Sequence, residues 1–309
     1  MIKILSCKNK NYLTKLKDFL DKRRSKKAID TSIVLKILAD IKKNKLKAVI
    51  KYEKKFGNNN KIKPTSKEIN KSIKNLDPKI KKSIDFAYNR IFKFHSLQKI
   101  KNIKYVDNYN NKIEYKYVPI SKLGLYCPAN LPSTLLMNAI PAKIAGVKKI
   151  VLANPRSNGK LNAAVMYAAK KIGIKEIYTV GGAQAIASLA YIQKVNKIVG
   201  PGNVYVARAK KEVFGEVGIE GMIAGPSEIT IVADKNTNLE EVVTSMIGQA
   251  EHDINSQCIL ITKDINLINN FIKNIFIKLK NLPRKNIAGI SLKKYGLIVH
   301  AQNDKQIID

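Results

Sequence analysis

Two amide side chains that follow glycine turns are the first groups in this chain that could bind a ligand. Gln184 follows the pair Gly181–Gly182, and Asn203 follows the turn 200–202, which reads Gly-Pro-Gly. Glycine lets the backbone approach a ligand closely, and an amide beside it can donate or accept a hydrogen bond. Either turn alone is explained as well by an ordinary turn or a helix cap. Because two similar turns follow neighbouring strand patterns, we predict one shared ligand crevice.

A second group with possible chemistry is the segment 249–253, which reads QAEHD. Gln249 and His252 stand three residues apart, so on a helix they would share a face and reach one point. Zinc accepts imidazole nitrogen together with oxygen donors, which makes this pair a candidate metal site. The alternative is a histidine that caps or covers the end of a helix.

A hydroxyl on the turn 224–228, which reads AGPSE, is a third candidate. Ser227 stands directly before the segment EITIVAD, whose β-branched and apolar residues predict a strand. A hydroxyl fixed on such a turn can contact a ligand, although serine before a strand is equally common for structural reasons. The residue type alone therefore leaves both interpretations of Ser227 open.

The first hundred residues, which must support these groups, read as mostly helical. The segment 32–56 repeats apolar residues near the 3.6-residue helical period, and Gly57 ends it. A second helical stretch spans about 66–97, with a break near Pro78. From Ile103 the period changes to two around a polar, Asn-rich turn, which predicts a β-hairpin.

After residue 120 short apolar runs alternate with helical patterns, which predicts an α/β fold with parallel sheets. The predicted strands lie at 148–155, 175–182, 196–203, 228–234, 256–264 and 294–301, and the predicted helices at 161–173, 183–192, 204–215, 239–253 and 265–282. We therefore expect two Rossmann-like, doubly wound parallel-sheet units plus a helical N-terminal arm. Neither unit has the usual G-x-G-x-x-G phosphate motif after its first strand.

The same alternation predicts how the chain is divided. Residues 1–120 would form the helical arm and the hairpin as part of a first α/β domain, and residues 121–223 a second α/β domain that carries the glycine turns. Residues 224–309 would return to the first domain with the candidate metal site.

The net charge of +34 raises the question of a nucleic-acid partner. Only six of the 57 basic residues are arginines, and arginine is the residue that makes bidentate and stacking contacts with nucleic acids. Lysine, asparagine and isoleucine are all abundant, and A/T-rich codons encode all of them, so a compositional drift of the genome explains the charge. We expect no specific nucleic-acid partner and only salt-sensitive adhesion to polyanions.

The sequence also lacks the features of a membrane or secreted protein. No segment approaches the roughly 20 uninterrupted apolar residues of a membrane-spanning helix, and the N-terminus has no secretory pattern. The three cysteines are widely spaced and predict no disulfide framework. We therefore expect a cytoplasmic protein without a membrane partner.

Several of these segments together resemble histidinol dehydrogenase. In chain order they read GLYCPA, PSTLLMNAIPAKIAGVKKIV, EIYTVGGAQAIASLAY, VNKIVGPGN, MIAGPSE and QAEHD, and they run from about Gly124 to Gln257. The combination of GGAQAIA, GPGNVYVA, AGPSE and QAEHD is specific to this family. The resemblance implies an NAD-dependent oxidoreductase of histidine biosynthesis, which oxidises L-histidinol through L-histidinaldehyde to L-histidine.

The resemblance also implies cofactors, a partner and roles for individual residues. In the family a zinc ion holds and orients the substrate, and two chains form a homodimer in which each active site draws on both. The resemblance implies NAD contacts for Tyr126, Gln184 and Asn203, substrate contacts for Ser227, Gln249 and His252, and zinc ligation by Gln249 and His252.

The family pattern continues beyond Asp309, where this sequence ends. The resemblance places there a Glu-His pair that acts as base and acid, followed by an aspartate and a histidine that complete the zinc shell. We therefore expect no catalytic acid–base residue within the chain. Two interpretations stay open: a histidinol dehydrogenase whose sequence here is partial, or an inactive, decayed or split fragment that retains the fold and some affinity for NAD or substrate. A basic nucleic-acid-binding protein is a third interpretation, against which the shortage of arginine argues.

Overall fold

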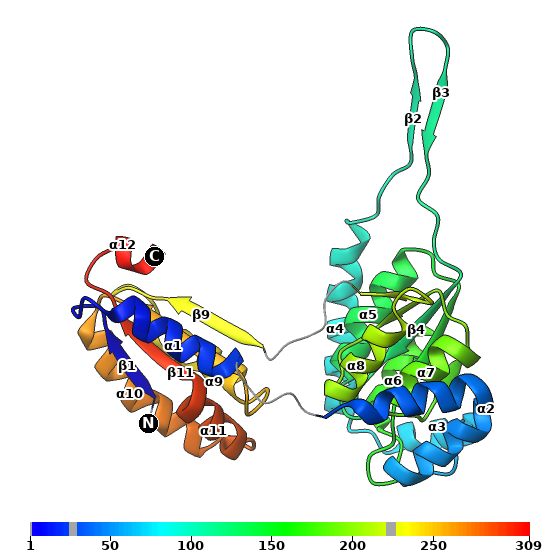
Figure 1. Ribbon diagram of the computed structural model, residues 1–309, viewed down its shortest axis with the longest axis horizontal. Helices are drawn as coiled ribbons and strands as arrows, with labels where there is room; N and C mark the ends of the chain where they lie inside the picture. Colours follow the sequence, from blue (N-terminus) through cyan, green and yellow to red (C-terminus); the bar gives the residue numbers. More distant parts are fainter. Residues whose placement is uncertain (1, 25–29, 221–226) are drawn as a thin grey trace. The chain divides into compact units, whose positions relative to one another are not determined.

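The computed structural model describes residues 2–24, 30–220 and 227–309. The chain forms two compact units: unit 1 consists of residues 1–28 and 224–309, and unit 2 of residues 29–223. Each unit has its own parallel β-sheet with helices on both faces (Figure 1). The predicted α/β class with two parallel-sheet units is therefore confirmed.

The division between the units differs from the predicted one. We expected residues 1–120 to belong to the first domain, whereas residues 29–120 lie in unit 2 together with residues 121–223. The physical reason is the apolar face of α2 (Ser32–Phe56), which buries Val34, Ile41 and Val49 in the same core as strand residues of the unit 2 sheet.

The unit 2 sheet has parallel strands in the order β6-β5-β4-β7-β8. Its strands are β4 (Lys122–Tyr126), β5 (Lys149–Ala153), β6 (Glu176–Tyr178), β7 (Lys197–Val199) and β8 (Gly218–Ile219). From β4 the chain builds outward on one side through β5 and β6, and then on the other side through β7 and β8. In open α/β sheets ligands bind at the carboxyl ends of the strands where the order reverses, which here is between β4 and β7.

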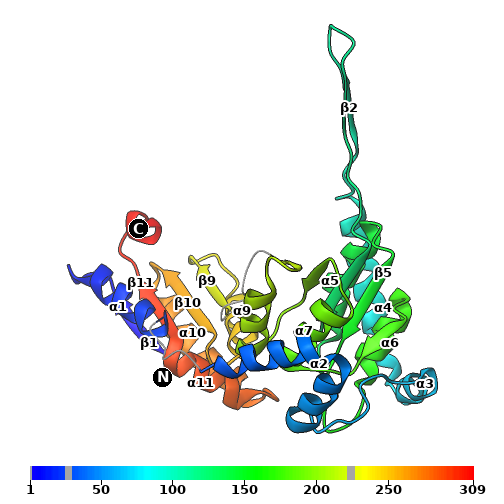
Figure 2. The same ribbon diagram turned by 45° about the vertical axis from the view of Figure 1, so that its right-hand side comes forward.

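Two layers of helices cover this sheet. One layer consists of α2, α7 (Gly182–Ala187), the short π-helix η1 (Ser188–Ile192) and α8 (Val204–Val213), and the other of α3 (Ser66–Lys74), α4 (Pro78–Ser96), α5 (Pro132–Ile144) and α6 (Ala163–Ile172). Successive strand residues point to opposite faces of the sheet, so they belong to two hydrophobic cores. Leu125 and Leu152 pack against the second layer of helices, whereas Tyr126 and Ala153 pack against the first. Figure 2 shows α2 and α7 on one side of unit 2 and α4 and α6 on the other.

A β-hairpin projects from unit 2 between α4 and β4 (Figures 1 and 2). β2 (Ile103–Val106) pairs antiparallel with β3 (Lys112–Tyr115), as the two-residue period predicted. The side chain of Asp107 closes the turn by accepting hydrogen bonds from the backbone of Tyr109 and Asn111, both at 2.8 Å. Every residue of the two strands is exposed.

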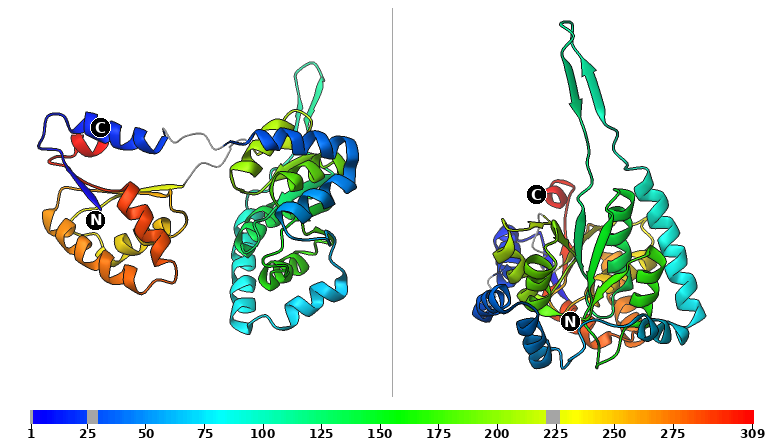
Figure 3. Two further views of the ribbon diagram at one scale, coloured as in Figure 1. Left: turned by 60° about the horizontal axis from the view of Figure 1, so that its bottom comes forward. Right: turned by 90° about the vertical axis from the view of Figure 1, so that its right-hand side faces the viewer.

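Unit 1 has parallel strands in the order β1-β11-β10-β9. The strands are β1 (Lys3–Ser6), β9 (Glu228–Val232), β10 (Gln257–Thr262) and β11 (Gly296–His300). Helix α1 (Tyr12–Arg24) covers one face, and α9 (Leu239–Ala250), α10 (Ile265–Lys280) and α11 (Lys285–Tyr295) cover the other (Figure 3). The short helix α12 (Lys305–Ile308) follows β11.

Two elements of unit 1 were not predicted. The N-terminal residues were expected within a helical arm, but residues 3–6 form the edge strand β1, which pairs with β11 at the other end of the chain. Four residues are too few to reveal a period, so the pairing and not the local pattern makes them a strand. Helix α11 was also not predicted.

None of the described helices is long and apolar enough to cross a membrane.

Candidate cofactor-binding site

A cavity of about 540 Å³ lies in unit 2 at the ends of β4 and β7, beside α2 and α7. Tyr126, the last residue of β4, lines this cavity together with Gln184 of α7 and Asn203 directly before α8. The two glycine turns therefore do lead to one crevice, and the three side chains expected to contact NAD share it.

Gly200 allows β7 to approach the end of β4 closely. Its φ is +107°, and a Cβ atom there would lie 1.9 Å from the carbonyl oxygen of Tyr126, so only glycine fits this backbone. The N–H of Gly200 donates to Glu220 Oε2 at 3.0 Å, and the Lys210 side chain bonds both the Gly200 carbonyl and Glu220. These contacts fix the turn that leads to Asn203.

Tyr126 presents a neutral phenol to the cavity. The residue is 5% exposed, and this burial raises the pKa of Tyr126 to about 12, against the effect of a hydrogen bond from the Gly182 backbone. At neutral pH the hydroxyl therefore stays protonated and can exchange hydrogen bonds with a ligand, but it is a poor base.

Gln184 is held by a buried carboxylate that sequence analysis missed. Glu53, in the last turn of α2, accepts hydrogen bonds at Oε2 from the backbone of Gly181 and from Gln184 Nε2, both at 3.1 Å. Glu53 is 1% exposed, and burial raises its pKa above the ordinary value, while hydrogen bonds from Gln184, Gly181 and Asn59 oppose the increase. In the sequence KYEKKF this glutamate reads as one charge on a solvated, lysine-rich helix face.

Asn203 both caps a helix and faces the cavity. Its Oδ1 accepts hydrogen bonds from the backbone of Tyr205 and Val206, both at 3.1 Å, at the start of α8. This is the usual role of asparagine at an N-cap. Because the oxygen is engaged, Nδ2 is the group of this side chain that can contact a ligand, and it can only donate.

A second wall residue that the sequence did not reveal is Arg156, which follows β5. Its side chain is 7% exposed, and Nη1 lies 2.7 Å from Glu68 Oε1. This guanidinium holds the pKa of Glu68 below its ordinary range. The wall of the cavity therefore contains one buried positive and one buried negative side chain.

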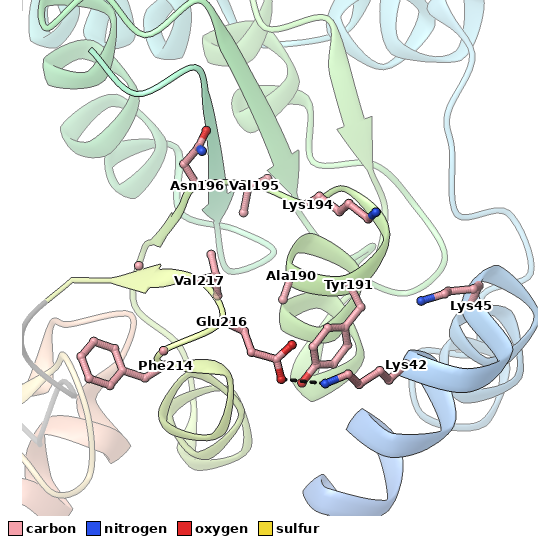
Figure 4. Close-up of a pocket in the computed structure, with 12 residues that line it drawn as sticks. Lys42, Lys45, Ala190, Tyr191, Lys194, Val195, Asn196, Phe214, Glu216 and Val217 are labelled. Carbon is pink, nitrogen blue, oxygen red and sulfur yellow. Dashed lines mark hydrogen bonds and ion pairs between the residues drawn. The ribbon is translucent and has the colours of Figure 1, made fainter. Parts of the chain in front are cut away.

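A larger and more open cavity of unit 2, about 670 Å³, is shown in Figure 4. It is lined by Lys42, Lys45, Tyr191, Lys194, Phe214 and Glu216 among others. Lys42 Nζ lies 2.8 Å from Glu216 Oε1 and 5.2 Å from the centroid of the Tyr191 ring. No predicted site residue lines this cavity, so convergence of ligand-binding side chains, and not volume, identifies the first cavity as the candidate site.

The other predicted site residues lie in unit 1. Gln249 is in the last turn of α9, which ends at Ala250, so His252 stands just beyond the helix. The prediction of a helix through residue 253 was therefore wrong at its end, although the backbone N–H of His252 still donates to the Gln249 carbonyl at 3.3 Å. His252 is exposed, whereas Gln249 Nε2 is buried without a hydrogen-bond partner among the described residues.

Ser227 lies directly before β9, and its carbonyl accepts a hydrogen bond from the Gln257 backbone at 3.1 Å. The side chain is exposed. The rest of the predicted turn before it, residues 224–226, falls outside the residues that the structure describes.

Gln249 and His252 supply fewer ligands than a zinc ion needs. Zinc in proteins usually takes three or four protein ligands. Within residues 2–24, 30–220 and 227–309, no cluster of three or more His, Cys, Asp or Glu side chains could hold a metal ion. His300, the last residue of β11, has its Nε2 3.3 Å from the Lys263 carbonyl. The described donor set alone therefore does not complete a zinc site.

Comparisons with known proteins agree with the fold and the motifs. Residues 20–309 match the family model of histidinol dehydrogenase. The chain is 55% identical to a histidinol dehydrogenase of Pelagibacter ubique, over 100% of this chain and 74% of that protein. It is 38% identical to histidinol dehydrogenase 1 of Trichormus variabilis, over 96% and 70% of the two chains. The crystal structure of histidinol dehydrogenase from Elizabethkingia anophelis is similar with a TM-score of 0.91 and 35% identity, over 99% of this chain and 72% of that chain.

Proposed function

The chain belongs to the histidinol dehydrogenase family, and on this premise we propose that it serves the NAD-dependent oxidation of L-histidinol, through L-histidinaldehyde, to L-histidine. The observation that carries the proposal is the convergence of Tyr126, Gln184 and Asn203 on one cavity. That cavity lies where the strand order of unit 2 reverses, the usual ligand site of such sheets.

The cavity has the chemistry that a dinucleotide needs. Bound NAD would supply the hydride acceptor for the oxidation. Ile33 and Ile37 of α2 give the cavity an apolar wall against which a flat ring can pack. Opposite polar groups then orient the cofactor: the Asn203 amide donates, and the neutral Tyr126 hydroxyl can donate or accept.

We assign the substrate to Ser227, Gln249 and His252, with Gln249 and His252 as two ligands of the zinc ion that the family resemblance implies. The exposed imidazole of His252, with Gln249 three residues before it at the end of α9, supports this assignment. Imidazole nitrogen and amide oxygen can both bind zinc. The role of these residues is to hold and orient the substrate; among the described residues, no cluster of three or more His, Cys, Asp or Glu side chains completes the zinc shell.

The first test is L-histidinol-dependent reduction of NAD⁺ by the purified chain, with zinc added and with a chelator as control. NADH formation that requires histidinol and that the chelator abolishes would show that the chain itself completes the zinc site. Because Gln249 and His252 supply only two of the three or four ligands that zinc usually takes, we expect little turnover. Calorimetric titration with NAD⁺ tests the cavity separately: Gln184→Ala should bind NAD⁺ more weakly, whereas Asp85→Asn, on the other face of the sheet, should not change binding. A folded chain without affinity for NAD⁺ would refute the cavity assignment. Binding without turnover would favour the fragment interpretation.

We also propose that the chain pairs with a second copy of itself, as the family resemblance implies, and that the β2–β3 hairpin contributes to the contact. The apolar side chains of Ile103, Tyr105 and Ile113 are 59%, 56% and 58% exposed, and an isolated two-stranded hairpin is at best marginally stable in water. The triple variant with serine at these positions should lower the molar mass measured by sedimentation equilibrium. The same mass for the variant and the unaltered dimer would exclude the hairpin from the contact.

A further inference from the structure

The buried carboxylate of Glu53 has no role in the site as described so far. It lines the cavity, it is 1% exposed, and the groups that donate to it are neutral: a backbone N–H and amide side chains. Burying a carboxylate without a cationic partner is unfavourable unless its hydrogen bonds are well satisfied. A neutral side chain would line the same wall at a lower cost in folding free energy, so the carboxylate calls for a functional explanation.

We propose that Glu53 is a positioning residue that fixes the orientation of the Gln184 side chain toward the cofactor. The inference rests on the proposed function, because Gln184 is assigned there to NAD. An ionised carboxylate can only accept hydrogen bonds, so the end of the Gln184 amide that faces Glu53 must be the Nε2 group, 3.1 Å from Oε2. Gln184 Oε1 therefore points away from Glu53.

The neighbouring glycine leaves room for this oxygen. Gly182 has a φ of +58°, and a Cβ atom there would lie 3.0 Å from Gln184 Oε1. The same carboxylate oxygen of Glu53 holds the Gly181 N–H, so the turn and the side chain are fixed by one acceptor. Because α2, which is kinked at Lys45, packs along α7 (Figures 1 and 2), the carboxylate reaches this turn from the last turn of α2.

Glu53 thus decides which kind of ligand group Gln184 can recognise. With Nε2 engaged, Gln184 offers an acceptor, whereas Asn203, with Oδ1 engaged in its helix cap, offers a donor. The cofactor group that bonds Gln184 Oε1 is therefore a hydrogen-bond donor, which in NAD is a ribose hydroxyl, the adenine amino group or the amide N–H of the nicotinamide. Without Glu53 the amide could rotate and present either end.

A double-mutant cycle tests this inference. The dissociation constant for NAD⁺ is measured by calorimetry for the unaltered protein, Glu53→Gln, Gln184→Ala and the double variant, with Asp85→Asn as a control for loss of a carboxylate elsewhere in unit 2. We expect Glu53→Gln to raise the dissociation constant about 3- to 10-fold, because the amide at position 53 can turn either its oxygen or its NH2 group toward Gln184 and no longer fixes one orientation. In the Gln184→Ala background the same change should have almost no effect, because the residues act as one unit.

Three outcomes decide between the possibilities. An undiminished effect of Glu53→Gln in the Gln184→Ala background would overturn the inference, since Glu53 would then act through the turn and not through Gln184. An unchanged dissociation constant for Glu53→Gln would overturn it as well. If the unaltered protein does not bind NAD⁺ at all, the proposed function itself fails, which the first titration reveals.

Two further measurements complete the design. If Glu53→Gln does not fold, Glu53→Asp keeps the charge but withdraws it by one methylene, and the same loss of coupling to Gln184 is expected.

The group of NAD⁺ that donates to Gln184 is identified with an NAD⁺ analogue in which an acetyl group replaces the carboxamide. Weaker binding of the analogue to the unaltered protein, but not to Glu53→Gln, assigns the donor to the carboxamide. Equal binding of both dinucleotides to the unaltered protein, with the cycle still coupled, excludes the carboxamide and leaves a ribose hydroxyl or the adenine amino group.

Discussion

The backbone of Gly200 leaves no room for a side chain, which makes it the residue of the site with the clearest steric requirement. In Gly200→Ala the new Cβ would lie 1.9 Å from the Tyr126 carbonyl at a φ of +107°. We expect a loss of about 2–5 kcal/mol in the free energy of unfolding, from overpacking and left-handed strain together, or an insoluble protein. Urea denaturation followed by circular dichroism measures it.

Gly159→Ala is the matched control for this substitution. Gly159 also has a positive φ, +73°, but nothing lies within 4 Å of a Cβ atom there. Only the backbone strain should remain, about 1–2 kcal/mol. Equal losses in the two variants would show that strain and not the contact with Tyr126 makes Gly200 necessary.

The raised pKa of Glu53 predicts how its charge affects stability. Because burial raises its pKa in the folded protein above the ordinary value near 4.5, the folded state binds the proton more tightly than the unfolded chain. Ionisation of Glu53 therefore opposes folding. This penalty is absent below the ordinary value and complete above the raised one.

The unaltered protein should therefore lose stability relative to Glu53→Gln as the pH rises from about 4.5 through the raised pKa. The urea midpoints of both proteins, measured over a series of pH values, give this difference. A difference that grows in the opposite direction, or that does not vary with pH, would show that Glu53 has an ordinary pKa or is compensated by a cation.

At the residue scale, the sequence predicted the groups that stand next to glycine turns but not those that support them. Gln184 and Asn203 could be found because a turn glycine and an amide at the end of a strand pattern have a local signature. Glu53 has none, because its role depends on Gly181 and Gln184, which lie far along the chain and meet it only in the tertiary structure.

At the element scale, helix α8 depends on Asn203 for its start, and this double role can be separated. Asn203→Asp keeps the oxygen that caps the helix but removes the Nδ2 donor, so stability should stay within about 0.5 kcal/mol, since both residues are good N-caps. Affinity for NAD⁺ should fall at least about 10-fold, because a donor is replaced by a carboxylate. Thermal unfolding and calorimetry measure the two quantities.

Asn203→Ala should instead lose both properties, with about 0.5–2 kcal/mol of stability gone with the cap. If Asn203→Asp binds NAD⁺ as well as the unaltered protein, the Nδ2 group does not contact the cofactor, and the proposed donor must be sought elsewhere in the cavity wall.

Most elements could be predicted because their periods are long or their ends are marked. Helix α2 has buried apolar residues on both sides of a kink at Lys45 and ends before Gly57. Helix α4 begins with a proline after a capping aspartate. Strand β1, with four residues, and the end of α9 before His252 could not, because tertiary pairing and helix capping decide them. The hairpin could be predicted although it is fully exposed, because its turn chemistry is local.

At the scale of the whole molecule, the division into units was the feature least accessible from sequence. The pattern of strands and helices does not say which sheet an N-terminal helix will cover, and α2 was assigned to the wrong one. Its buried residues pack with those of α7 and α8 in a single core. That assignment matters for the site, since α2 brings Glu53 to Gln184.

The net charge of +34 is the other property of the whole molecule, and it predicts adhesion to polyanions without recognition. The chain should bind unrelated DNA duplexes with affinities that differ by no more than about 2-fold, and the affinity should fall steeply between about 50 and 200 mM salt as counterions are released. Fluorescence anisotropy with labelled duplexes measures the affinity for DNA at each salt concentration. Binding of NAD⁺ in the same salt series is the control, because the affinity of a cavity with few net charges should depend far less on salt. A sequence-preferring complex that is still stable in about 0.5 M salt would contradict the explanation of the charge by genome composition and would support a nucleic-acid function. With six arginines among 57 basic residues, we expect the nonspecific result, since lysine neutralises phosphates but seldom reads bases.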